Sequence, residues 1–188
     1  MSVRNKFLLD PAKAALLVID VQERLCAAMD HDALQRLTKN IGILLESANE
    51  LALPVIFTEQ YVKGLGPTLG ELRQKAPAAP GIEKLTFSCC GNDDFIKQLK
   101  STGKKQVIVS GMETHVCVLQ TVIELLGEGY DVHLVKDAVM SRSPDNRQTA
   151  IEAMVLAGAV PTSTESVVFQ LLKIAGTDSF KKLSKLVK

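Results

Sequence analysis

Short apolar runs alternate along the chain with segments in which apolar residues recur every three or four positions. The runs are rich in Val, Ile and Leu, which is typical of buried β-strands, and they predict strands at residues 14–19, 55–57, 82–87, 106–109, 131–135 and 159–162. The longer spacing predicts helices at residues 32–51, 92–99 (with Asn92 as the cap), 114–126 and 144–157, and one or two more at the C-terminus.

Strands and helices that alternate in this way predict an α/β fold of three layers, a doubly wound parallel sheet with helices on both faces. In a six-stranded sheet of order 3-2-1-4-5-6, ligands bind beyond the carboxyl ends of the strands, where the strand order reverses. Asp20 follows the first strand, and the segment from Gly111 to Cys117 follows the fourth. We therefore expect a carboxylate beside a thiol. The chain has no Gly-x-Gly-x-x-Gly motif after the first strand and no Gly-x-x-x-x-Gly-Lys-Ser/Thr motif anywhere. The fold class alone is therefore a weak reason to expect a nucleotide.

The length of 188 residues fits one domain, residues 1–188. Because 46% of the residues are hydrophobic and only 4% are aromatic, we expect an aliphatic core. The net charge of +1, from 22 basic and 21 acidic side chains, gives no long-range attraction for nucleic acid or an anionic membrane. No stretch approaches the roughly 20 apolar residues of a membrane span. The chain has no Cys-x-x-Cys pair and no signal peptide, which disfavours a zinc site and predicts a cytoplasmic location.

The strongest candidate for chemistry is Cys117. An apolar strand ends at Gly111, and a polar turn then opens a helix with this cysteine in its first turns. Free backbone N–H groups and the positive end of a helix dipole would favour the thiolate, so we expect alkylation of Cys117 below the ordinary thiol pKa of about 8.5. The alternative is a small buried residue on an apolar helix.

A cysteine nucleophile needs a group that receives its proton. His115 is two residues away on a helix and points to another side. Asp20 is a better candidate, although it could equally cap a helix that begins near Gln22. Lys84 would ordinarily be a solvated surface residue or a partner of Glu83.

Three motifs resemble the isochorismatase-like cysteine hydrolases, over roughly residues 10 to 175. They are Val-Ile-Asp-Val-Gln around Asp20, Lys84 ahead of Thr-Phe-Ser, and Gly-Met-Glu-Thr-His-Val-Cys ending at Cys117; the loop at residues 58–68 resembles isochorismatase-domain proteins in particular. The resemblance implies a six-stranded parallel sheet and a catalytic triad of Asp20, Lys84 and Cys117. Lys84 would stabilise the thiolate, and Asp20 would shuttle the proton.

The resemblance also implies a cis peptide bond at Met112–Glu113, which would aim the backbone N–H groups of Glu113 and Cys117 at a developing oxyanion. The nicotinamidases of this superfamily hold a metal through a histidine cluster after the second strand, but residues 58–61 contain no histidine. We therefore expect no metal and no cofactor. The predicted pocket residues, each of which could also be structural, are Gln22, Gln60, Tyr61, Thr114 and His115.

Isochorismatases proper cleave a vinyl ether without a cysteine nucleophile, so Cys117 indicates hydrolysis of a small amide, carbamoyl compound or ester through an acyl-enzyme. One alternative is a thiol redox or adduct-binding protein assisted by Cys89 and Cys90; another is a catalytically silent oligomeric scaffold. The expected partners are a small-molecule substrate and, as is common in the family, further copies of the chain.

Overall fold

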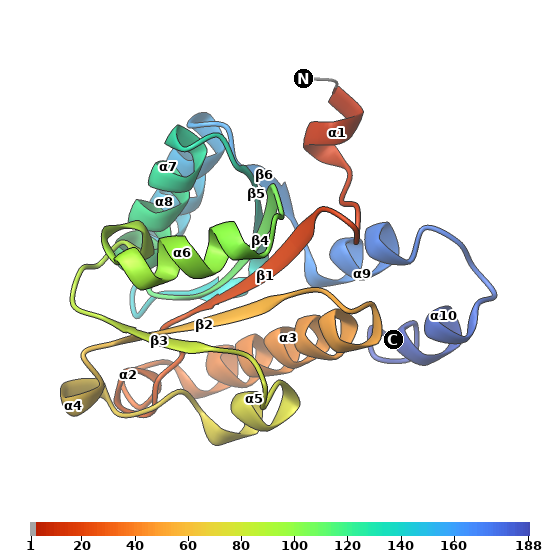
Figure 1. The fold of residues 1–188 in the computed structure, drawn as a ribbon. Helices are drawn as coiled ribbons and strands as arrows, with labels where there is room; N and C mark the ends of the chain where they lie inside the picture. Colours follow the sequence, from red (N-terminus) through yellow and green to blue (C-terminus); the bar gives the residue numbers. More distant parts are fainter. Residues whose placement is uncertain (1–2) are drawn as a thin grey trace.

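The computed structural model describes residues 3–188, apart from the side chain of Asn5, and contains a six-stranded parallel sheet of order β3-β2-β1-β4-β5-β6 (Figure 1). This is the predicted doubly wound order. The strands are β1 (Ala14–Ile19), β2 (Val55–Gln60), β3 (Gly81–Lys84), β4 (Gln106–Met112), β5 (Asp131–Met140) and β6 (Val160–Thr162).

Helices surround the sheet and connect its strands. They are α1 (Val3–Phe7), α2 (Glu23–Cys26), α3 (His31–Glu50), α4 (Val62–Leu65), α5 (Gly70–Lys75), α6 (Asp93–Ser101), α7 (Leu119–Gly127), α8 (Pro144–Leu156), α9 (Thr164–Leu172) and α10 (Asp178–Leu183). A 3-10 turn (Cys89–Gly91) precedes α6, and a π-helical turn (Thr114–Val118) leads into α7.

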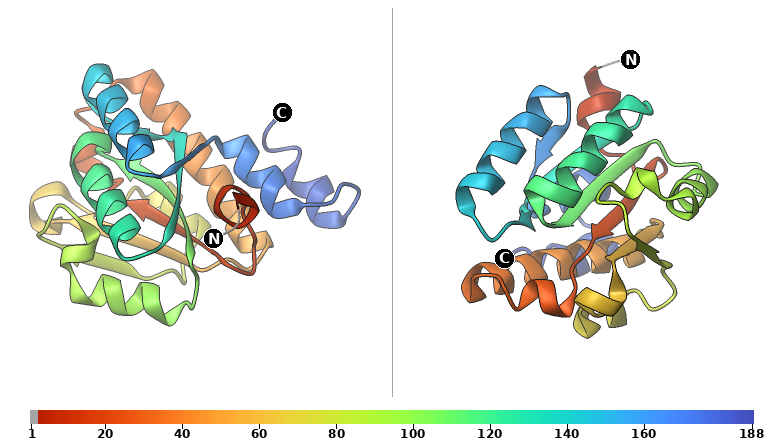
Figure 2. Two further views of the ribbon diagram at one scale, coloured as in Figure 1. Left: turned by 90° about the horizontal axis from the view of Figure 1, so that it is seen from above. Right: turned by 90° about the vertical axis from the view of Figure 1, so that its left-hand side faces the viewer.

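Helices cover both faces of the sheet (Figure 2), and a hydrophobic core on each face holds the three layers together. Alternate residues of β1 point to opposite faces: Leu16 and Val18 pack towards α3, α5 and α9, whereas Leu17 and Ile19 pack towards α6, α7 and α8. All six residues of β1 are buried, as the continuous apolar run predicts for a central parallel strand. A smaller cluster, formed by Ile43, Val168 and Leu183, attaches α10.

Strand lengths differ from the prediction where polar residues continue the pairing. β2 runs on to Gln60 because Thr58 to Gln60 pair in register with Ile82 to Lys84 of β3. In contrast, β3 ends at Lys84 and not at Phe87, because the chain turns there and directs the carbonyls of Thr86 and Phe87 towards the Lys84 ammonium. β5 extends to Met140 across an irregularity in its pairing with β4.

Candidate active site

The carboxyl ends of β1, β3 and β4 bring Asp20, Lys84 and Cys117 together. These ends lie at the left-hand edge of the sheet in Figure 1. All three side chains are buried, with residue exposures of 0%, 2% and 6% respectively. Lys84 lies two strands away from β1, and its long side chain crosses the end of β2 to place Nζ 2.7 Å from Oδ2 of Asp20.

Asp20 uses its side chain within the site and not as a helix cap. Its Oδ1 accepts a hydrogen bond from the Thr58 hydroxyl at 2.7 Å, while Oδ2 accepts from Lys84. The following helix, α2, has Gln22 at its N-cap, without a side-chain cap hydrogen bond. The backbone of Asp20 has φ of 51°, in the left-handed region that non-glycine residues seldom occupy. The cap interpretation of Asp20 is therefore wrong.

Lys84 is a buried cation surrounded by oxygen atoms. Besides Asp20, its Nζ donates to Oε1 of Gln60 at 2.8 Å, to the Phe87 carbonyl at 2.9 Å and to the Thr86 carbonyl at 3.2 Å. Burial by itself lowers the pKa of Lys84, but the negative charge of Asp20, with smaller contributions from the nearby thiols, raises that pKa above its ordinary value overall. Lys84 is therefore a permanent ammonium and not a solvated surface residue.

Cys117 lies in the π-helical turn, where the Asp20 carboxylate acts on the pKa of its thiol. Burial raises the pKa of this thiol well above its usual range; the negative charge of Asp20 raises it further, and the Lys84 ammonium only partly offsets both. This balance favours the thiol over the expected thiolate, because Lys84 is already paired with Asp20.

The close approach of β1 and β4 brings the segments that carry Asp20 and Cys117 side by side. Gly111 has φ of 116° and pairs with Ile19 across the two strands. A Cβ atom at Gly111 would overlap the backbone of Ile19, including its carbonyl oxygen. Only glycine fits here, on both conformational and steric grounds.

The segment before Cys117 is anchored to the loop that follows β5. The Met112–Glu113 peptide bond is cis. The Glu113 carboxylate accepts hydrogen bonds from the Arg142 backbone N–H at 3.0 Å and from its Nε and Nη2 atoms at 3.1 and 3.2 Å. Although burial raises the pKa of Glu113, these hydrogen bonds lower it overall. Nδ1 of His115 lies 3.0 Å from the Ser141 hydroxyl. This contact is a second link between the segment before Cys117 and the loop that follows β5.

The other predicted pocket residues divide into buried and exposed positions. The Gln22 side chain is buried and fully committed to the loop at residues 60–66: it accepts from the Gln60 N–H and donates to the carbonyls of Gln60 and Gly66. Gln60 itself contacts Lys84. Tyr61 is 49% exposed, and Thr114 is fully buried with a hydroxyl that has no hydrogen-bond partner.

Sequence reasoning missed Thr58 and the position of Cys89. Thr58 donates to Asp20, and the buried Cys89 thiol lies 3.7 Å from the Thr58 hydroxyl. Extending β2 past Phe57 in parallel register would have placed Thr58 level with Ile19, next to Asp20. Within residues 3–188, no group of three His, Cys, Asp or Glu side chains could hold a metal ion. No helix in this range is long and apolar enough to cross a membrane.

The state of the Cys117 thiol leads to a prediction. Replacing Asp20 by Asn should lower the pKa of Cys117, because it removes the negative charge and leaves the Lys84 cation. We expect alkylation of Cys117 by iodoacetamide at pH 8 to become about tenfold faster. The measurement is the alkylation rate of each cysteine peptide by mass spectrometry.

The buried Cys26, whose pKa is raised to about 11 mainly by burial, provides an internal control that should react equally in both proteins. A slower reaction of Cys117 in the Asp20→Asn protein would show that Asp20 does not hold the thiol in its protonated form.

The chain is similar to known proteins over most of its length. Residues 14–166 match the family described as "Isochorismatase domain". The chain is 38% identical to "Isochorismatase family protein 1B" of Dictyostelium discoideum, over 95% of this chain and 87% of that protein. It resembles the solved MAR1 ribonuclease of Caenorhabditis elegans (TM-score 0.89, 36% identity, 96% and 92% of the two chains).

The chain also resembles the YcaC gene product of Escherichia coli, described as an octameric hydrolase of unknown specificity (TM-score 0.88, 31% identity, 95% and 90% of the two chains). The family match covers most of the chain, and the matched protein of Dictyostelium spans nearly all of it. The chain therefore belongs to the isochorismatase family and has its hydrolase fold.

Proposed function

We propose that this protein is a cysteine-dependent hydrolase that cleaves a small amide, carbamoyl compound or ester through a covalent acyl-enzyme. The observation that carries the proposal is the buried Lys84–Asp20 ion pair, whose carboxylate and ammonium both act on the pKa of the Cys117 thiol. An ion pair with no solvent exposure is costly to bury, and such pairs are frequent where chemistry requires them. No metal or cofactor takes part.

In the acylation step, Sγ of Cys117 attacks the substrate carbonyl carbon while its proton passes to Asp20. The negative charge moves to the carbonyl oxygen, which the backbone N–H groups of Glu113 and Cys117 would stabilise. Asp20 then gives the proton to the leaving amine or alcohol as the carbon–nitrogen or carbon–oxygen bond breaks. A thioester on Cys117 remains.

In the deacylation step, Asp20 takes a proton from a water molecule that attacks the thioester. The carbon–sulfur bond breaks, the carboxylic or carbamic acid leaves, and Sγ recovers the proton from Asp20. Lys84 keeps its proton throughout, because it is paired with the Asp20 carboxylate at rest and again once the thioester has formed, and the negative charge leaves Asp20 only for the oxyanion of the short-lived tetrahedral intermediates. Gln60 and the carbonyls after β3 hold the Lys84 ammonium in place.

The same features favour hydrolysis over thiol redox chemistry. Burial raises the pKa of Cys89 to about 11 and that of Cys90 to about 12, and the pKa of Cys117 is raised as well. Peroxides oxidise thiolates and not thiols, so these side chains are poorly suited to react with them. In the proposed reaction, Asp20 takes the proton of Cys117 only while the sulfur attacks the substrate carbonyl, and this arrangement is suited to acyl transfer.

We propose that the substrate contacts Tyr61, Gln60, Thr114 and His115, while Gln22 holds the loop that carries Tyr61. We further propose a cytoplasmic homo-oligomer. The four unpaired cysteines support a reducing compartment, and the octameric assembly of the similar protein of Escherichia coli supports self-association.

The acyl-enzyme can be trapped directly. A panel of small primary amides, carbamoyl compounds and esters, with p-nitrophenyl acetate as the most reactive member and single-stranded RNA as a competitor class, is incubated with the protein and quenched in acid. We expect a single acyl group on Cys117 by peptide mapping, because the thioester survives acid. Acylation spread over several cysteines and lysines, or turnover of RNA alone, would reject the proposal.

A further inference from the structure

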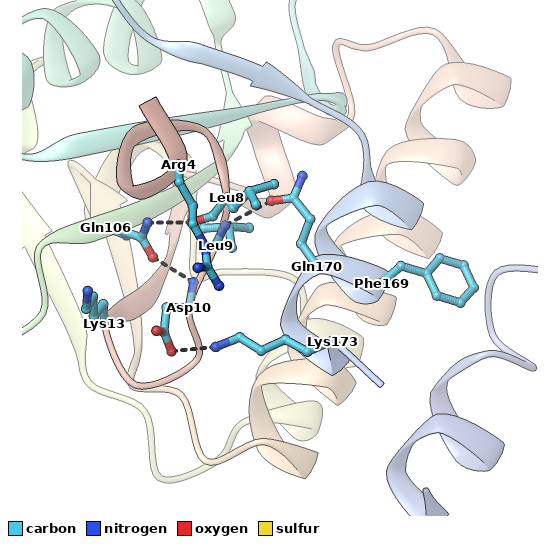
Figure 3. A pocket seen from close by; sticks show the side chains of 9 residues that line it. All are labelled: Arg4, Leu8, Leu9, Asp10, Lys13, Gln106, Phe169, Gln170 and Lys173. Atoms are coloured by element: carbon cyan, nitrogen blue, oxygen red, sulfur yellow. Dashed lines mark hydrogen bonds and ion pairs between the residues drawn. The ribbon is translucent and has the colours of Figure 1, made fainter. Parts of the chain in front are cut away.

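A cavity of about 380 Å³ lies at the amino end of the sheet, opposite to the edge that carries Cys117 (Figure 3). It is bounded by α1, by the linker at residues 8–13 before β1, by the first residue of β4 and by the end of α9. This volume falls within the range of small-molecule binding sites. None of the residues that line it takes part in the proposed hydrolysis.

Two glutamine side chains hold the linker that forms one wall of the cavity (Figure 3). Gln106, which is buried, accepts from the Asp10 N–H at 2.8 Å and donates to the Leu8 carbonyl at 2.9 Å. Gln170 accepts from the Leu9 N–H at 2.9 Å. Consecutive backbone groups of the linker are thus fixed from both β4 and α9, so the cavity has a defined wall.

The cavity is lined by three cations and one carboxylate: Arg4, Lys13, Lys173 and Asp10. Asp10 forms an ion pair with Nζ of Lys173 at 3.0 Å and accepts a hydrogen bond from the Ala12 N–H at 3.0 Å. Asp10 therefore neutralises one cation and fixes the position of its ammonium group. Two positive charges remain in excess, and Figure 3 shows the Arg4 guanidinium beside the linker at the centre of the group.

The backbone conformation of Lys173 is a further sign that its side chain matters in the cavity. Lys173 follows the last residue of α9 with φ of 59°, in the left-handed region where glycine is by far the most favourable residue at a helix end. A lysine here is unfavourable for the backbone and provides a side chain that glycine would lack. That side chain reaches into the cavity and contacts Asp10.

We propose that this cavity binds the phosphate group of a small metabolite. A phosphate carries close to two negative charges near neutral pH, which matches the excess charge of the lining residues. The Arg4 guanidinium can hold two phosphate oxygens at once, and Lys13 and Lys173 can each donate to a third. The cavity is larger than a free phosphate ion requires, so the remaining volume accommodates the organic part of the ligand.

The test is a titration of the full-length protein at physiological ionic strength, with amide chemical shifts followed by NMR. Phenyl phosphate and inorganic phosphate are the two probes, and phenol is the uncharged comparison. We expect saturable shifts at Gln106 and Lys173 with either phosphate and none with phenol. Tighter binding of phenyl phosphate identifies a phosphate ester as the ligand, and equal affinity identifies free phosphate.

The variant Arg4→Gln/Lys13→Gln should weaken phosphate binding at least tenfold, since it removes the two cations that Asp10 does not neutralise. Both side chains are exposed, so the fold should persist. The control Lys63→Gln/Lys97→Gln removes two positive charges from α4 and α6 and should bind as the wild type does. Equal affinity in all three proteins, or no saturable shift with the wild type, would overturn the proposal. So would dissociation of an oligomer by the first variant, because the cavity would then belong to a subunit interface.

Discussion

Replacing Cys117 by Ala should lower kcat/KM for any amide or ester that the wild type hydrolyses by at least about 1000-fold, because the acyl-enzyme can no longer form. Cys117→Ser should be nearly as inactive, since a hydroxyl is harder to deprotonate than a thiol. The rates are measured under initial-velocity conditions with the substrate found in the panel. Unchanged circular dichroism would show that the fold is retained.

The matched control is Cys90→Ser. Cys90 is a partly buried thiol of the same chain, and it has no role in the proposed reaction. We expect this variant to keep the wild-type rate. If Cys117→Ala retained more than a tenth of the activity, the chemistry would proceed without this sulfur, and covalent catalysis would be rejected.

Replacing Lys84 by Met should be the most destabilising single change in the site. Met keeps the length of the side chain but leaves the Asp20 carboxylate buried without its cation. Breaking a buried ion pair in this way costs about 3–5 kcal/mol in the free energy of unfolding. The measurement is urea unfolding at pH 7, and activity should be lost together with stability.

The double variant Asp20→Asn/Lys84→Met separates stability from catalysis. It removes both charges, so we expect the free energy of unfolding to recover by at least half of the loss, while activity remains absent. Lys97→Met, which removes an exposed partner of Asp94 on α6, should leave stability nearly unchanged. A double variant no more stable than Lys84→Met would show that charge pairing does not hold this part of the fold.

Much of the architecture follows from the periodicity of the sequence. The apolar run at residues 14–19 coincides with β1, and the helical spacing at residues 32–51 reproduces α3 to within one residue at each end. Asn92 caps α6 through its side chain, as predicted. These features depend on local chemistry, which a single segment contains in full.

The contacts between side chains in the site could not be predicted from the sequence as the helices and strands could. No local pattern shows that Lys84 reaches across β2 or that Thr58 donates to Asp20, because both contacts depend on the register of three strands. The pKa of the Cys117 thiol depends on the same contacts. A cation near a thiol lowers its pKa only to the extent that another anion does not already neutralise that cation.

The glycine at position 111 sets a limit on how this chain can evolve. Any larger residue there would push β1 and β4 apart at the level of Ile19, one residue before Asp20, and would move Asp20 away from Cys117. If the proposed reaction takes place, descendants with a side chain at position 111 should keep the sheet and lose the proton transfer between Cys117 and Asp20. In newly sequenced relatives, the residue at this position should separate working enzymes from copies that have lost the reaction.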